Sequence, residues 1–214
     1  MAGVIETVVF DLGGVLIDWN PRYLYRKIFD DESEMEYFLT KIATMEWHLE
    51  QDRGRTMKEA TEILAAKYPE HDAEIRAFYD RWPEMFDGPI HGTVEILREL
   101  RDLGYPLHAL TNYSAEAFVL ARRDYDFLEW FDQIIVSGEE GMIKPDRELY
   151  AVLIARTGLD PATTVFIDDS IPNVAAAREL GFTGVAFDNA ELLREELTKL
   201  DLLNEPTERM TSDA

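Results

Sequence analysis

The sequence predicts an α/β fold, in which helices cover both faces of a mostly parallel sheet and an α-helical insertion follows the first strand. Three observations support this prediction. Short apolar runs alternate with amphipathic segments over residues 93–200. The stretch from about Pro21 to Phe86 instead has apolar residues at helical spacing, and no strand is expected in it. The 214 residues are 46% hydrophobic, which is enough to bury a core in one domain with an insertion.

The first strand is expected in the run TVVF, because β-branched and aromatic residues favour strands. In the insertion, Thr56–Tyr68 predicts an amphipathic helix with Thr56 as its N-cap and Glu59 three positions later. Gly88 and Pro89 mark the exit from the insertion. We therefore predict three parts: a core (1–17 and 88–203), a helical cap (18–87) and a flexible tail (204–214).

After Gly92, segments typical of strands alternate with segments typical of helices. This order implies right-handed crossovers between parallel strands. Ser114 is expected to cap one helix, and another is expected to begin at Pro145 and end at Gly158, the preferred order of these residues. The expected strands are 106–112, 133–137, 165–169 and 183–187. The expected helices are 93–104, 114–123, 145–158, 171–181 and 190–200.

Composition excludes several classes of function. The formal net charge of -22 and the sequence pI ≈ 4.4 argue against nucleic-acid and membrane-surface partners. The absence of cysteine excludes disulfides, thiolate catalysis and cysteine zinc sites, and it fits a reducing compartment. The first ten residues lack a basic region, so no signal peptide is expected. We expect a cytoplasmic protein with a small-molecule partner, and the oligomeric state is not predicted.

Polar residues gather where the predicted strands end. Ligands of such sheets bind outside the carboxyl ends of the strands, so these positions are the candidate site. Each residue alone has a structural interpretation as a turn, a cap or a surface charge. Their common position at one edge of the sheet favours a functional interpretation. They are Asp11, Gly13 and Gly14 after the first strand, Thr111 and Asn112 after the second, Lys144, and Asp168 and Asp169 after the fourth.

These residue types fit chemistry on a phosphate ester. Asp11 is a carboxylate that can attack phosphorus and form an aspartyl-phosphate. Asp168 and Asp169 supply hard oxygen ligands suited to Mg²⁺. Lys144 adds positive charge for the developing oxyanion and holds the Asp11 and Asp168 charges together. The Thr111 hydroxyl and the backbone N–H groups before the next helix favour an anion.

Four segments resemble the ordered motifs of the haloacid dehalogenase superfamily of hydrolases: VVFDLGGVLIDWNP (8–21), LTN (110–112), IKPDRELY (143–150) and FIDDSIPNVAAAREL (166–180). The resemblance implies a Rossmann-like core with a helical cap. It also implies Asp11 as nucleophile. The metal ligands would be Asp11, Gly13, Asp168 and Asp169, and the phosphate would be bound by Gly14, Thr111, Asn112 and Lys144. Within the superfamily the chain is similar to alpha-D-glucose-1-phosphatase-type sugar phosphatases, including the cap segment EQDRGRTMKEA (50–60).

Gly13 departs from the family pattern, in which phosphatases carry a second aspartate there as general acid and base. Glycine keeps the backbone carbonyl that ligates the metal, but it removes a proton donor that is worth about 10²–10⁴-fold in rate. Leaving groups that need little help, such as an anomeric sugar oxygen or a phenolate, should then be favoured. Asp18 and His48 are candidate substitutes from the cap.

The leading function is a Mg²⁺-dependent phosphatase of a small phosphorylated metabolite, with a sugar phosphate as the best candidate. Two alternatives stay open. A 2-haloacid dehalogenase would use Asp11 as a metal-free nucleophile, although dehalogenases resembling this core generally lack the paired aspartates. A non-catalytic phosphometabolite-binding protein is the other. We expect the aromatic residues of the cap to pack in its core more often than to stack on a sugar. Asn173 is expected either to orient the two metal-binding aspartates or to cap its helix. The cap aromatics considered are Trp19, Tyr23, Trp47 and Trp82.

Overall fold

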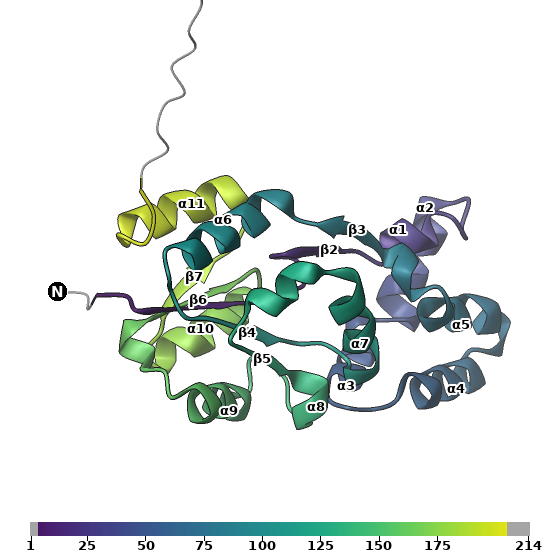
Figure 1. The fold of residues 1–214 in the computed structure, drawn as a ribbon. Coiled ribbons are helices and arrows are strands. Elements are labelled where there is room, and N and C mark those ends of the chain that lie inside the picture. The colour runs from purple at the N-terminus through teal and green to yellow at the C-terminus, as the bar shows by residue number, and fades with distance from the viewer. Residues whose placement is uncertain (1–3, 205–214) are drawn as a thin grey trace, which may run out of the picture.

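A computed structural model of the protein describes residues 4–204. A five-stranded parallel sheet lies at its centre, with strand order β5-β4-β1-β6-β7 (Figure 1). The chain enters in the middle, builds outward through β4 and β5, and returns to the other side of β1 for β6 and β7. The strand order therefore switches at β1, and the carboxyl ends of β4, β1 and β6 lie side by side. The strands are β1 (Thr7–Phe10), β4 (Leu107–Thr111), β5 (Gln133–Val136), β6 (Thr164–Asp168) and β7 (Thr183–Ala186).

Helices cover both faces of this sheet (Figure 1). One face packs against α6 (His91–Asp102), α7 (Ala115–Asp124) and α11 (Ala190–Lys199) through residues such as Leu97, Phe118 and Leu197. The other face packs against α9 (Arg147–Thr157) and α10 (Ile171–Glu179), through residues such as Tyr150 and Leu153. The strands β1, β4 and β6 are buried along their whole length, as expected for parallel strands covered on two sides. The predicted α/β architecture is confirmed.

Two predicted helix starts differ in detail. The helix expected from Pro145 begins two residues later, with Asp146 as N-cap, and the Lys144–Pro145 peptide bond is cis. Ser114 occupies the N-cap position of α7, but its side chain makes no capping hydrogen bond. By contrast, Gly158 ends α9 with φ 71°, in the left-handed conformation that glycine adopts at low cost.

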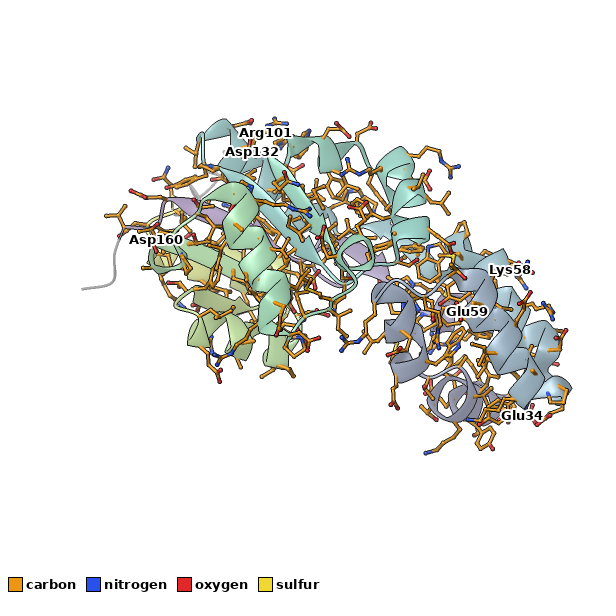
Figure 2. All side chains as sticks on the ribbon, turned by 90° about the horizontal axis from the view of Figure 1, so that it is seen from below. Glu34, Lys58, Glu59, Arg101, Asp132 and Asp160 are labelled. Atoms are coloured by element: carbon orange, nitrogen blue, oxygen red, sulfur yellow. The ribbon has the colours of Figure 1, made fainter. Side chains whose placement is uncertain are left out.

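The segment between residues 20 and 85 is helical, and it lies at one end of the molecule (Figures 1 and 2). In Figure 2, Lys58 and Glu34 are labelled on this part and Asp160 on the opposite, sheet-containing part. The Thr56 side chain accepts a hydrogen bond from Glu59 N at 3.2 Å and caps α4 as predicted. The helices are α1 (Arg22–Tyr25), α2 (Glu32–Tyr37), the π-helical turn Phe38–Ile42, α3 (Met45–Asp52), α4 (Met57–Lys67) and α5 (Asp72–Asp80). The short 3₁₀ turns are Pro69–His71 and Trp82–Met85 here, and Asp126–Trp130 and Pro161–Thr163 elsewhere; α8 (Ser137–Glu140) follows β5.

A small antiparallel pair joins the two parts: β2 (Ile17–Trp19) runs out of the sheet region and β3 (Phe86–Pro89) returns to it. The pair was not predicted, because each strand is very short and Gly88–Pro89 has the composition of a turn. The boundaries of the core and cap stay a prediction, and we keep both names for the ranges given above. The predicted flexible tail lies outside the described residues except for Asn204. No helix within residues 4–204 is long and apolar enough to span a membrane.

Candidate active site

Asp11 stands directly after β1, at the point where the strand order switches. Its backbone N–H donates to Ile167 O at 2.8 Å, which continues the ladder between β1 and β6 and places Asp11 beside the end of β6. The side chain is buried, and its Oδ1 accepts a hydrogen bond from Leu12 N at 2.7 Å. The carboxylate is therefore held in one orientation by its own strand end.

Lys144 joins the carboxylates of two strands. Its Nζ lies 2.9 Å from Asp11 Oδ2 and 2.7 Å from Asp168 Oδ2, and it donates to Leu110 O at 2.7 Å. The Lys144 side chain is fully buried. Asn112 fixes its backbone, because Asn112 Oδ1 accepts from Lys144 N at 2.8 Å and Asn112 Nδ2 donates to Lys144 O at 3.0 Å. The Asn112 side chain thus positions Lys144, and its contact with a phosphate stays a prediction.

Asp168 has the most extensive hydrogen bonding of the site. Besides Lys144, its carboxylate accepts from Ser170 N at 2.8 Å and from Asn173 Nδ2 at 3.0 and 3.2 Å. Asn173 therefore orients one member of the aspartate pair, as one of its two predicted roles requires. Such hydrogen bonds fix the direction of a carboxylate and leave it suited to ligating a metal ion.

Three carboxylates face one another at this edge. Asp11, Asp168 and Asp169 each have one carboxylate oxygen within 4.8 Å of an oxygen of the other two. The three groups bring three negative charges when ionised, against one positive charge on Lys144. The backbone carbonyl of Gly13 accepts no hydrogen bond from the described residues, so it is free to act as a further oxygen ligand. An all-oxygen, negatively charged set fits a hard divalent cation such as Mg²⁺.

Burial and mutual repulsion shift the ionisation of these groups. Burial, helped by the charge of Asp168, raises the pKa of Asp11 to about 7 against the opposing effect of Lys144. Burial lowers the pKa of Lys144, but the Asp11 and Asp168 charges outweigh it, so the net shift is upward and the lysine stays charged. Burial and then Asp168 also raise the pKa of Asp169. A divalent cation among the carboxylates would favour their ionised forms.

The two glycines after Asp11 have different constraints. Gly14 has φ 74°, and a Cβ there would collide with the Asp169 carboxylate, so glycine is required both by the turn and by the close approach. A Cβ built on Gly13 meets no atom within 4 Å. The position therefore has space for a side chain. Steric hindrance does not explain why this chain lacks the family's second aspartate there.

Thr111 ends β4 next to these groups. It is fully buried, and within the described residues its Oγ1 has no hydrogen-bond partner. An unpaired buried hydroxyl costs about 1–3 kcal/mol, so such groups in native proteins usually await a ligand or water. This observation fits the predicted contact of Thr111 with a bound phosphate.

A cavity of about 510 Å³ opens between the core and the cap, with the acidic cluster on its floor. This volume lies in the range of sites for small molecules, roughly 300–1,000 Å³. The core supplies the polar lining residues Asp11, Gly13, Gly14, Asn112, Lys144, Asp169, Ser170 and Asn173, with Tyr113, Pro145 and Pro172. The cap supplies the remaining residues, Trp19, Met45, His48, Leu49, Asp52 and Trp82.

Comparison with known proteins matches residues 5–181 to the model of one family, described as haloacid dehalogenase-like hydrolase. The chain belongs to this family. The fold and family predicted from the motifs are thus confirmed, and the protein is an enzyme of this hydrolase family.

Curated relatives include several phosphatases, which support its class as a phosphoric monoester hydrolase. Sesquiterpene phosphatase astK of Aspergillus oryzae is 29% identical over 201 residues, 94% of this chain and 98% of that protein. The Phosphorylated carbohydrates phosphatase of Thermotoga maritima is 26% identical over 83% of this chain and 82% of that protein. Among solved structures, a HAD family enzyme of Bacteroides thetaiotaomicron in a magnesium complex has a TM-score of 0.70 and 22% identity, covering 90% of this chain and 100% of that chain.

In this haloacid dehalogenase-like hydrolase, neither candidate substitute for the missing acid is well placed to act. Asp18 is absent from the cavity lining, and its carboxylate accepts hydrogen bonds from Tyr23 OH at 3.0 and 3.1 Å. His48 lines the cavity, but burial lowers its pKa to about 4, so its ring is neutral near pH 7. A neutral imidazole is a weak acid, which makes His48 a poor proton donor.

The cap aromatics divide between the cavity and the interior. Trp19 stacks on His48 with ring centroids 5.2 Å apart, lies 5.9 Å from Trp82, and both tryptophans line the cavity. Trp47 instead packs edge-on against Phe78 in the cap interior, at 5.1 Å. The expectation of core packing thus fits Trp47, whereas Trp19 and Trp82 form part of the cavity wall.

Asp52 is the lining carboxylate that the sequence analysis did not single out. It is the last residue of α3, and a lone carboxylate at a helix end has no local pattern that separates it from a solvated surface charge. Its neighbours Arg53 and Gly54 belong to the cap segment that resembles sugar phosphatases, and this was the only available signal.

Proposed function

We propose that this hydrolase is a Mg²⁺-dependent phosphatase of a small phosphorylated metabolite, with Asp11 as the nucleophile. One observation carries the proposal: Lys144 joins Asp11 to Asp168 beside a third carboxylate and an unpaired threonine hydroxyl, at one edge of the sheet. The phosphatase relatives and the family support it. The residues proposed to hold the metal are Asp11, Gly13 through its carbonyl, Asp168 and Asp169.

The chain's own residues divide the reaction between them. The Asp11 carboxylate attacks phosphorus, the bond to the leaving-group oxygen breaks, and an aspartyl-phosphate forms; water then releases inorganic phosphate and restores Asp11. Thr111 donates its hydroxyl to a phosphoryl oxygen, and Lys144 balances the negative charge around it. Magnesium bound beside the carboxylates would offset the repulsion between Asp11 and the phosphoryl group.

A sugar phosphate is the substrate class we propose first. Trp19 and Trp82 offer aromatic faces to a sugar ring, and the carbohydrate phosphatase relative supports this choice. The wall also contains Met45 and Leu49, which would suit an apolar phosphate ester, and the sesquiterpene phosphatase relative makes an isoprenoid monophosphate the second candidate. A phosphate-release screen over sugar and isoprenoid monophosphates decides between them.

The test of the reaction uses p-nitrophenyl phosphate with Mg²⁺ and with EDTA. Asp11→Asn should lower turnover by ~10³-fold or more, the scale expected when a nucleophile is removed. Asp18→Asn is the matched control, since it loses the same charge outside the cavity and should keep activity. Full activity of Asp11→Asn, or full activity in EDTA, would overturn the proposal.

The alternatives give different results in the same experiment. A 2-haloacid dehalogenase would release halide from 2-chloropropionate in EDTA, a reaction that does not need the charge of Asp168 and Asp169. A non-catalytic binding protein would bind phosphometabolites without releasing phosphate. The three-carboxylate cluster favours the phosphatase over both, because neither alternative explains its excess negative charge.

A further inference from the structure

Expulsion of an alcohol from a phosphate ester requires a proton for the departing oxygen, and Gly13 supplies none. We propose that Asp52 of the cap is the general acid that protonates the leaving group, in place of the aspartate missing at Gly13. The inference rests on the proposed function. It assigns to the cap a chemical step that phosphatases with the second aspartate carry out from the core.

The position of Asp52 fits this role. It lines the same cavity as Asp11 and Lys144 but belongs to α3, so it faces the acidic cluster from the cap side. The backbone of Ser114, in the loop that follows Thr111, is near enough to this carboxyl group to lower its pKa. The group therefore lies close to the end of β4, where we place the phosphate. A leaving group that extends into the cavity must pass between the core floor and the cap wall.

The end of α3 is fixed on both sides of Asp52. Arg53 Nη1 lies 2.8 Å from Asp146 Oδ2, which ties the cap to the start of α9. On the other side, Gln51 is fully buried, and its Nε2 donates to Tyr79 OH and to Trp47 O, each at 2.8 Å. General-acid catalysis needs a donor held within hydrogen-bond reach of the departing oxygen, and these contacts restrict where Asp52 can point.

The surroundings of Asp52 keep its proton in place. The side chain is 5% exposed, and its one ion-pair neighbour within residues 4–204 is His48, whose Nε2 lies 3.9 Å from Asp52 Oδ2. Burial, followed by the Asp11 charge, raises the pKa of Asp52 to about 7, against the opposing effects of the Ser114 backbone and the Lys144 charge. An acid with a pKa near the working pH can both give up and recover a proton, as this role requires.

The proton transfers balance over one turnover. As the Asp11–phosphorus bond forms and the ester bond breaks, the departing oxygen takes the proton of Asp52 and leaves as an alcohol. Asp52 is then a carboxylate. In the second half it accepts a proton from the water that attacks the aspartyl-phosphate, which returns Asp52 to its acid form and releases inorganic phosphate. Ester and water are consumed, and alcohol and phosphate are formed.

The decisive experiment compares two substrates of nearly the same shape, phenyl phosphate and p-nitrophenyl phosphate. Phenolate needs less help than an ordinary alkoxide, but it still needs a proton on departure much more than p-nitrophenolate does. Asp52→Asn keeps the size of the side chain but has no acidic proton, so kcat/KM for phenyl phosphate should fall about 100-fold or more, while that for p-nitrophenyl phosphate falls less than about tenfold. Asp18→Asn, the matched control outside the cavity, should leave the ratio of the two substrates unchanged.

A second variant separates a proton donor from a structural role. Gly13→Asp/Asp52→Asn places a carboxyl group at the open Gly13 position and should restore phenyl phosphate turnover at least tenfold over Asp52→Asn. An equal loss for both substrates in Asp52→Asn, without recovery in the double variant, would overturn the inference and assign Asp52 to cap docking. Failure of the proposed function would look different, since the unmodified enzyme would then hydrolyse neither substrate.

Discussion

The site has two sides that differ in how their buried ionisable groups are paired. We call the residues at the strand ends of the core the floor (Asp11, Thr111, Lys144, Asp168 and Asp169), and the cap residues that line the cavity, His48 and Asp52 among them, the wall. On the core floor, Lys144 meets two aspartates within 2.9 Å, and Asp168 also accepts hydrogen bonds from Ser170 and Asn173. On the cap wall, the carboxyl group of Asp52 and the ring of His48 are buried, and within residues 4–204 their only ion-pair contact is with each other, at 3.9 Å. Their pKa values shift toward the neutral forms, upward for Asp52 and downward for His48.

This difference separates two tasks. A floor of paired charges is suited to a phosphoryl group and a metal ion, both of which keep their charge during the reaction. A wall of neutral groups is suited to the leaving group, which is uncharged before and after the reaction and needs only a proton. The predictions below test whether the charges on the floor and the neutrality of the wall are as distinct as the structure indicates.

The largest expected effect is on the floor. Lys144→Met should destabilise the metal-free protein by about 3–5 kcal/mol, because it leaves the buried carboxylates of Asp11 and Asp168 without their cation. Guanidinium chloride unfolding in EDTA measures the change. Lys58→Met is the control, since its side chain is 85% exposed and its single ion pair should contribute below about 1 kcal/mol. Equal stabilities of the two variants would mean that Lys144 does not stabilise the buried carboxylates of Asp11 and Asp168.

The second prediction concerns the wall and its dependence on pH. Burial raises the pKa of Asp52 to about 7 in the folded protein, from an ordinary value of 3.8, so the folded state holds the proton more tightly across this interval. Stability due to Asp52 is therefore fully present below about pH 4 and is lost as the pH rises to about 7. Since one pKa unit corresponds to about 1.4 kcal/mol, the loss is at most ~4 kcal/mol.

Asp52→Asn removes this loss, so the variant should gain stability over the unmodified protein as the pH rises from 5 to 8. His48 works in the opposite direction, because its lowered pKa makes the folded state more stable as the pH rises from about 4 to 6.5. The difference between variant and parent cancels that contribution. Asp30→Asn, at an exposed site, controls for the loss of one negative charge. A difference that does not change with pH would show that Asp52 is ionised in the folded protein.

The sequence predicted the floor far better than the wall, for a physical reason. Asp11, Thr111 and Asp168 directly end or follow strands, so the strand pattern and the parallel connections bring them to one edge without any knowledge of packing. The structure also brings Lys144 and Asp169 to this edge. The exact roles of these residues stay predictions, and Asn112 was given a phosphate contact although its side chain holds the Lys144 backbone.

The wall depends on packing that no local pattern encodes. Asp52 reaches the site because α3 packs against α8, which lies more than eighty positions further along the chain. Residue type and position in the cap make Asp18 and His48 candidate acids. In the structure, however, the Asp18 carboxylate accepts a hydrogen bond from Tyr23 OH, and burial lowers the pKa of His48. The β2–β3 pair was missed for a related reason, since its short strands are stable only when paired with each other.

The smallest expected effect is at Thr111, which is the one uncharged side chain of the floor and in that respect resembles the neutral groups of the wall. Its buried hydroxyl lacks a hydrogen-bond partner in the described part of the chain, so Thr111→Val should change the stability of the ligand-free protein by only about 1 kcal/mol, in the stabilising direction. If the hydroxyl binds the phosphoryl group, kcat/KM should nevertheless fall about 10–100-fold, the value of a hydrogen bond to a charged group.

Thr93→Val is a closely matched control for this substitution. Thr93 is fully buried, and its Oγ1 also lacks a partner within residues 4–204, but it lies in α6 and not at the carboxyl end of a strand of the site. Both variants should shift the unfolding midpoint in the same direction, and Thr111→Val alone should lose activity. If both keep full kcat/KM, the unpaired hydroxyl of Thr111 does not bind the phosphate, and the floor must bind its ligand through Lys144, the metal and backbone groups instead.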